Sequence, residues 1–261
     1  MSQPNPDTKD DGKRIKDAAR DLAAGHAASR SLGTAPVVLD RLPALEKVLR
    51  EAYAGFVQLS EDRGALSGVG EWLLDNFYVV QQGIRQIREN MPPGYYARLP
   101  KLEDSRLRGY PRIYALARRI VQLNGGHVDV NQAALFVRAY QDERALTMGE
   151  IWALPTMLRL AAVELLAQAV SRAVEAENPV EDAAWPDLLG LEGERDEALV
   201  AAAIKSLRAI DAQDWDTFFE ATSLVESRLR DDPAGVYARM DFDTRDRYRG
   251  AIEELARGVE E

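Results

Sequence analysis

Two acidic side chains, Glu71 and Asp75, have the spacing at which a pair of carboxylates could share one face of a helix. They are four positions apart, which is about one helical turn. Glycoside hydrolysis uses two such carboxyl groups, one as the acid and the other as base or nucleophile. Pairs at this spacing are common by chance in an acidic chain, and a hydrolase also needs a pocket and a neighbour that perturbs one carboxyl. We therefore favour a structural role for this pair and predict no catalytic residue in this chain.

The tripeptide Asp241-Phe242-Asp243 has the Asp-x-Asp form in which many nucleotide-sugar transferases hold a divalent metal. Such a site needs oxygen ligands that converge on one ion and on a diphosphate. Here the tripeptide stands directly before a predicted helix, in a chain without predicted strands. A carboxylate in this position caps the helix and interacts favourably with its N-terminal end. We favour helix capping by Asp243, and we predict no metal site and no cofactor.

A local excess of positive charge lies between residues 98 and 119. This segment has seven basic residues against two acidic ones, whereas the whole chain has a net charge of −10. Such a patch could bind a lipid head group, a diphosphate or the acidic face of a partner protein. The alternative, which we favour, is a solvated segment paired with the acidic stretch 175–197, because runs of charge usually face water. The candidate anion-binding or partner-binding residues are Arg98, Lys101, Arg106, Arg108 and Arg112.

Tyrosines accompany this basic segment. Tyr95, Tyr96 and Tyr110 are candidate sugar-stacking residues, because an aromatic face with a hydroxyl group suits contact with a glucan. The more common role of such tyrosines is to anchor a loop on the core by ring burial and one hydrogen bond. We favour loop anchoring.

Composition excludes several other kinds of chemistry. The chain has 43 acidic against 33 basic residues, which argues against general binding of nucleic acid. It has no cysteine, so it forms no disulfide and no cysteine-ligated zinc site. Its two histidines, His26 and His127, are far apart in sequence and leave little material for a histidine-based triad. We expect His26 in a flexible segment and His127 in a glycine turn.

The apolar pattern that must position these residues is helical. Leu73, Phe77, Val80 and Ile84 alternate spacings of four and three, which places them along one stripe of a helix. No run shows the sustained two-residue alternation of a strand. The predicted fold is all-α, a multi-helix bundle with a flexible N-terminal tail. We divide the chain into a flexible tail (1–33), a main helical bundle (34–175), an acidic linker (176–197) and a smaller C-terminal helical unit (198–261).

The most apolar stretch runs from Ile151 to Val170, after a capping box formed by Thr147 and Glu150. Arg159 and Glu164 interrupt it, and its polar residues share one half of the helical circumference. Charges at these positions would be costly in hydrocarbon. We predict a core helix with one wet side rather than a membrane span.

Four blocks of sequence together carry a resemblance to a known family. They are GEWLLDNFYVVQQGIRQIRENMPPGYYARLP (70–100), GYPRIYALARRIV (109–121), FVRAYQDERALTMGEIWALPTMLRLAAVELL (136–166) and VYARMDFDTRDRYR (236–249). In order and spacing they resemble the N-terminal region of the cyclic β-1,2-glucan synthases, and they are also similar to related large proteins described as glucoamylase-like. The resemblance covers roughly residues 39–258.

The resemblance implies a role beside a large bacterial enzyme of the inner membrane. Proteins of that family use UDP-glucose to build a β-1,2-linked glucan on themselves and release it as a ring, and a membrane-embedded glycosyltransferase domain carries the catalysis. This chain resembles the region before that domain, so no family catalytic residue can be transferred to it. We expect a helical scaffold or accessory module, not catalytic by itself. It would lie on the cytoplasmic side and pack against the glycosyltransferase domain, in the same polypeptide or as a separate chain.

Two alternatives stay open at this point. One is a free-standing hydrolase acting on β-glucan through Glu71, Asp75 or Glu150, which requires two carboxyl groups that converge in an open cleft. The other is a glucan-binding helical module, which requires an exposed row of tyrosines.

Overall fold

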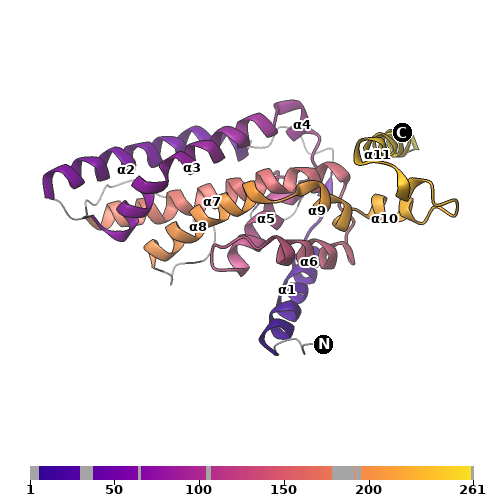
Figure 1. The fold of residues 1–261 in the computed structure, drawn as a ribbon, viewed down its shortest axis with the longest axis horizontal. Coiled ribbons are helices and arrows are strands. Elements are labelled where there is room, and N and C mark those ends of the chain that lie inside the picture. The colour runs from indigo at the N-terminus through magenta and orange to yellow at the C-terminus, as the bar shows by residue number, and fades with distance from the viewer. Residues whose placement is uncertain are drawn as a thin grey trace.

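A computed structural model describes residues 6–29, 38–63, 66–103, 107–177, 191 and 195–259. Nearly all of them are helical, which confirms the all-α fold (Figure 1). The helices are α1 (Pro6–Ala24), α2 (Leu42–Arg63), α3 (Gly68–Asn90), α4 (Pro93–Ala97), α5 (Arg112–Leu123), α6 (Val130–Gln141), α7 (Met148–Glu177), α8 (Asp196–Ala212), α9 (Trp215–Thr222), α10 (Leu224–Arg230) and α11 (Phe242–Val259). Short 3-10 helices occur at Val38–Arg41 (η1) and Tyr237–Arg239 (η2). In the described part of the chain, β1 (Ala28–Ser29) and β2 (Lys101–Leu102) form one antiparallel pair.

Helix α7 is the central element of the bundle. It packs against α2, α3, α5 and α8, and apolar side chains such as Leu154 and Leu158 are fully buried. Among the described helices, its segment Met148–Val174 is the one long and apolar enough to cross a membrane, and 89% of that apolar window is buried inside the protein. A helix whose apolar surface is covered by other helices in this way is typical of the core of a bundle.

The charged side chains on the polar side of α7, Arg159 and Glu164, form their hydrogen bonds and ion pairs with protein groups instead of water. Arg159 is buried and forms an ion pair with Asp211 at 2.9 Å. Glu164 has no exposed surface; it accepts hydrogen bonds from the Tyr114 hydroxyl at 2.9 and 2.8 Å and lies 3.4 Å from Arg41. Burial raises the pKa of the Glu164 carboxyl above its usual range, although Arg41 and the Tyr114 hydrogen bond act against this shift. The predicted wet side was therefore wrong.

The N-terminal segment also differs from the prediction. Helix α1 packs against α6, and its Ile15, Ala19 and Ala23 are buried in the common core. After α1, His26 is buried, and its Nδ1 lies 3.0 Å from the Tyr140 hydroxyl. The prediction of a flexible tail must therefore be corrected for the described part of α1 and for His26. The small side chains of Ala19 and Ala23 allow α1 to pack closely against α6, although the N-terminal sequence has few large apolar residues.

Most of the predicted acidic linker, 176–197, lies outside the described residues. Helix α8, which follows it, packs against α7 and α3, and its Leu199, Ile204 and Leu207 belong to the same buried core. The division of the chain into two units stays a prediction. The structure adds that α8 is part of the bundle built around α7.

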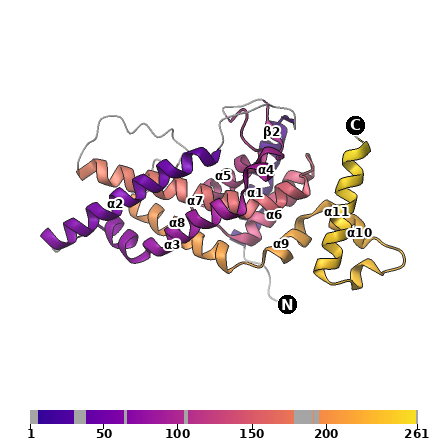
Figure 2. The same cartoon turned by 90° about the horizontal axis from the view of Figure 1, so that it is seen from above.

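Helices α10 and α11 lie at one end of the molecule, away from the C-terminal end of α2 and the N-terminal end of α3 (Figures 1 and 2). A buried ion pair joins them: Arg249 of α11 is 1% exposed and donates to Glu226 of α10 at 2.7 Å. The Tyr237 hydroxyl donates to the same carboxylate at 2.6 Å. Burial favours the neutral acid, but the hydrogen bonds from Tyr237 and Arg249 prevail and lower the pKa of Glu226. Glu226 therefore carries the negative charge that the buried guanidinium requires.

The Asp-x-Asp tripeptide is explained by the start of α11. Both carboxylate oxygens of Asp241 accept from Thr244, one from its backbone N–H at 2.8 Å and one from its hydroxyl at 3.0 Å. Helix capping is thus confirmed, but Asp241 is the capping residue instead of Asp243. The helix begins at Phe242, two residues earlier than a cap at Asp243 implies, which moves the cap to Asp241.

A candidate ligand-binding cleft

Arg112, from the predicted basic patch, faces the protein interior. Its Nε and Nη2 donate to the two carboxylate oxygens of Glu150 at 2.8 and 2.6 Å, and its Nη2 also donates to the carbonyl of Ala145 at 3.0 Å. Glu150 has no exposed surface and also accepts from the backbone N–H of Thr147 at 2.9 Å, as in the predicted capping box. Arg112 is therefore not placed to bind an anion from solvent.

The other members of the predicted patch have different environments. Lys101 is buried, and its Nζ donates to the carbonyl of Ala97 at 2.9 Å. Arg98 and Arg108 are exposed. Arg106 lies outside the described residues. Of the candidate cations, Arg98 is the one that lines a cavity, as described below.

The three candidate tyrosines have different environments. Tyr96 is buried, and its hydroxyl accepts a hydrogen bond from the backbone N–H of Val38 at 3.1 Å, which is the loop-anchoring arrangement. Tyr110 is half-buried and stacks on Tyr114 with ring centroids 5.7 Å apart. Tyr95 is half-buried, and its hydroxyl donates to the carbonyl of Gly149. They do not form an exposed row, and Tyr95 is the one that reaches the cavity.

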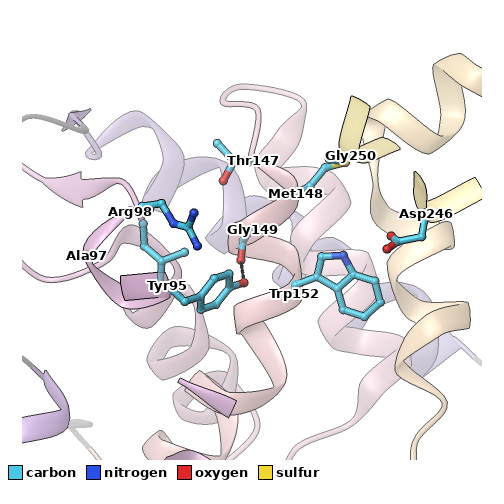
Figure 3. Close-up of a pocket in the computed structure, with 10 residues that line it drawn as sticks. Tyr95, Ala97, Arg98, Thr147, Met148, Gly149, Trp152, Asp246 and Gly250 are labelled. Atoms are coloured by element: carbon cyan, nitrogen blue, oxygen red, sulfur yellow. Dashed lines mark hydrogen bonds between the residues drawn. The ribbon is translucent and has the colours of Figure 1, made fainter. Parts of the chain in front are cut away.

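A cleft of about 510 Å³ opens between the chain around α4, the first turns of α7 and the side of α11 (Figure 3). Tyr95 and Arg98 line it from the α4 side, Thr147 and Trp152 from α7, and Asp246 from α11. Small-molecule sites in proteins usually have volumes of about 300 to 1,000 Å³. The cleft therefore has the size of a ligand site.

Neighbouring aromatic rings fix the position of Trp152, which forms one wall of the cleft. The indole of Trp152 stacks on Phe219 with ring centroids 4.4 Å apart and an interplanar angle of 17°, and it meets the edge of Phe242 at 6.2 Å. The half-buried indole is thus fixed in position while part of it faces the cavity. Its N–H donates no hydrogen bond within the described residues and is not among the buried unsatisfied atoms there, so it is accessible.

Two opposite charges complete the lining. The guanidinium of Arg98 makes no hydrogen bond or ion pair with any described residue, and in Figure 3 it is directed toward the first turn of α7. Asp246 is held on one oxygen by Arg249, whose Nη2 lies 3.2 Å from Oδ1, and its side chain is 54% exposed. In Figure 3, Trp152 and Asp246 face one another from α7 and α11. The cleft thus combines aromatic surface with donors and one carboxylate oxygen that have no partner among the described residues.

Sequence reasoning missed most of this site. Trp152 falls on the apolar pattern of its helix, which predicts a core residue, and nothing local marks Asp246. They lie on helices that are far apart in the chain, and only the packing of α9 and α11 against the start of α7 brings them together. The excess of basic residues pointed to the neighbourhood of Arg98, but not to its role in the cleft.

The carboxylates named in the hydrolase alternative do not converge. Glu71 and Asp75 are both exposed on α3, whereas Glu150 is buried in its ion pair with Arg112. Asp246 is the single carboxylate among the residues that line the described cleft. Within the described part of the chain, no group of three or more His, Asp or Glu side chains could hold a metal ion. The cleft therefore offers binding groups but not a pair of carboxyl groups.

The fold and the cleft define an all-helical bundle protein with a mixed aromatic and polar ligand cleft. No family model matches the chain. It is 28% identical over 278 residues to the cyclic beta-(1,2)-glucan synthase NdvB of Rhizobium meliloti (strain 1021), an alignment that covers 81% of this chain and 10% of that protein. The resemblance to the cyclic β-1,2-glucan synthases is thereby confirmed. The chain spans about a tenth of the length of this curated relative.

Proposed function

We propose that this chain is a helical accessory module of a cyclic β-1,2-glucan synthase-like, UDP-glucose-dependent glucosyltransferase, and that it does not catalyse glucosyl transfer by itself. The observation that carries the proposal is the similarity to NdvB, which extends over 81% of this chain but over only a tenth of the synthase. The module acts beside the glycosyltransferase domain, in the same polypeptide or as a separate chain, at the cytoplasmic face of the inner membrane.

The chemistry of the described residues supports a binding role over a catalytic one. Glycosidases place two carboxyl groups on either side of the bond that they cleave. Here Glu150 is paired with Arg112 and Glu226 with Arg249, and Asp246 is the one carboxylate among the residues that line the described cleft. This distribution of carboxylates also gives the free-standing hydrolase less support than the accessory module.

The C-terminal helix supplies a surface for the partner domain. Tyr248 and Leu255 of α11 are seven residues apart and therefore lie on the same side of the helix, and they are 50% and 71% exposed. Leu224 and Val236, which precede α11, are also exposed. Large exposed apolar side chains on one side of a helix, such as Tyr248 and Leu255, are typical of a protein interface. We propose that this surface packs against the remaining synthase polypeptide.

Two measurements test the proposal. The purified chain is incubated with radiolabelled UDP-glucose, and we expect no incorporation of glucose into protein or glucan. Its binding to the synthase polypeptide that lacks the aligned region is then measured by pull-down, and Tyr248→Ser should weaken it. Tyr78→Ser is the matched control, because Tyr78 is 62% exposed on α3, on another helix.

Glucosyl transfer by the isolated chain would contradict the proposal, provided that it is lost when a single carboxylate is changed to its amide. Failure of the intact chain to bind the synthase polypeptide would also contradict it. Equal weakening by the two tyrosine substitutions would count against α11 as the interface.

A further inference from the structure

We infer that the cleft between α4, α7 and α11 binds a segment of neutral glucan chain, with Trp152, Arg98 and Asp246 as its recognition residues. The inference rests on the proposed function and deepens it by naming a ligand for the module. The ligand chemistry is inferred from the lining of the cleft, which includes Tyr95 and Arg98 from the sequence candidates and adds Trp152 and Asp246.

The shape and composition of the lining suit a sugar. A pyranose ring has an apolar face of C–H groups and a rim of hydroxyl groups, so it binds best where an aromatic surface stands beside hydrogen-bonding groups. Trp152 and Tyr95 supply aromatic surface on two sides of the cleft (Figure 3). Both are fixed before a ligand arrives, Trp152 by stacking on Phe219 and Tyr95 by its hydrogen bond to Gly149. Fixed groups lose little conformational entropy on binding.

The polar groups of the cleft match a polyol in both donors and acceptors. The guanidinium of Arg98 and the indole N–H of Trp152 have no partner among the described residues, so both can donate to hydroxyl oxygens. Asp246 uses Oδ1 for Arg249, and its Oδ2, which has no partner in the described part of the chain, can accept from a hydroxyl group. Each hydroxyl group of a sugar both donates and accepts, and this lining offers partners for both.

The charge balance favours a neutral ligand over an anionic one. Arg98 and Asp246 carry opposite charges, and they are the charged side chains among the residues that line the described cleft. A diphosphate needs several cations or a metal ion, and its repulsion by Asp246 would offset its attraction to one arginine. Arg112 and Lys101, which would have strengthened an anion site, are buried with other partners. The cleft is therefore built for a glucan chain rather than for the nucleotide of UDP-glucose.

Calorimetric titration of the intact chain with linear β-1,2-gluco-oligosaccharides tests this inference, with UDP as the competing anion. Arg98→Ala removes an exposed side chain, and Trp152→Phe removes the indole N–H while it keeps a ring against Phe219. Loss of one such hydrogen bond should weaken binding by about tenfold in each variant. The matched controls are Arg108→Ala, another exposed arginine, and Trp72→Phe, another half-buried tryptophan outside the cleft.

We expect the unmodified chain and both controls to bind the oligosaccharide with affinities within about twofold of one another. We expect UDP not to displace it. Three results would overturn the inference: no binding by a folded chain, displacement by UDP, or equal weakening in the controls and the cleft variants. Melting followed by circular dichroism establishes that each variant is folded, so that a loss of binding is not mistaken for unfolding.

Failure here is distinguishable from failure of the proposed function. A chain that binds the synthase polypeptide but no oligosaccharide refutes the glucan cleft and leaves the accessory role intact. A chain that binds the oligosaccharide and also transfers glucose refutes the accessory role and leaves the cleft intact.

Discussion

Replacing Arg112 by methionine should destabilise the protein strongly, because it leaves a buried carboxylate without its cation. The side chains of Arg112 and Glu150 are 9% and 0% exposed, and two hydrogen bonds of 2.8 and 2.6 Å join them. Breaking a buried ion pair from one side costs about 3–5 kcal/mol. Glu150 keeps the N–H and the hydroxyl of Thr147 as donors, at 2.9 and 3.1 Å, which places this cost near the lower end of that range.

A second loss adds to the first. Arg112 also donates to the carbonyl of Ala145 at 3.0 Å, and an unsatisfied carbonyl adds about 1 kcal/mol. The expected decrease in the free energy of unfolding for Arg112→Met is therefore about 4 kcal/mol, a large part of the roughly 5–15 kcal/mol that holds a domain folded. Urea unfolding followed by far-ultraviolet circular dichroism measures it, with Arg108→Met as the exposed control.

The double variant Arg112→Met/Glu150→Gln distinguishes the cost of an unpaired buried charge from the cost of lost side-chain packing. It removes the buried charge together with its partner, so its cost should be smaller than the sum of the two single costs by about 2–3 kcal/mol. If Arg112→Met unfolds within about 0.5 kcal/mol of the unmodified chain, the reasoning fails, since surface substitutions have effects of that size. The predicted role of Arg112 in an anion patch would then become the better explanation.

Two further predictions concern burial elsewhere in the bundle. Burial, and to a smaller extent the nearby arginines, lowers the pKa of His26 to about 4, whereas the pKa is about 6.5 in an unfolded chain. Between these two pH values the histidine of the folded protein stays neutral, while that of the unfolded chain binds a proton. Stability should therefore decrease by about 2–3 kcal/mol as the pH falls from 6.5 to 4, and His26→Phe should flatten this part of a plot of unfolding free energy against pH. Gly126→Ala should lower the free energy of unfolding by about 1–3 kcal/mol, since φ is +90° there and a Cβ would lie 2.7 Å from Leu165. A thermal melt checks this, with Gly55→Ala, where a Cβ would meet no atom within 4 Å, as the control.

The sequence allowed the helices to be predicted well, because apolar spacing and caps are local signals. Thr147 and Glu150 form the predicted capping box, and the all-α fold follows from the pattern. The positions of buried polar groups could not be predicted in the same way. Arg159 and Glu164 were interpreted as solvent-facing, whereas each has a buried or partly buried partner on another helix. Which helix supplies a partner is decided by tertiary packing, and no spacing within α7 encodes it.

The cleft and the C-terminal ion pair depend on the same residues, and this links ligand binding to the placement of α11. Arg249 holds Glu226 with one nitrogen and Asp246 with another, and its guanidinium lies 5.0 Å from the ring centre of Phe219. Phe219 in turn supports Trp152 on the opposite side of the cleft. One buried cation therefore fixes both walls relative to each other. Because the exposed apolar side of α11 is the surface we propose for the synthase, that surface and the cleft residue Asp246 lie on the same helix.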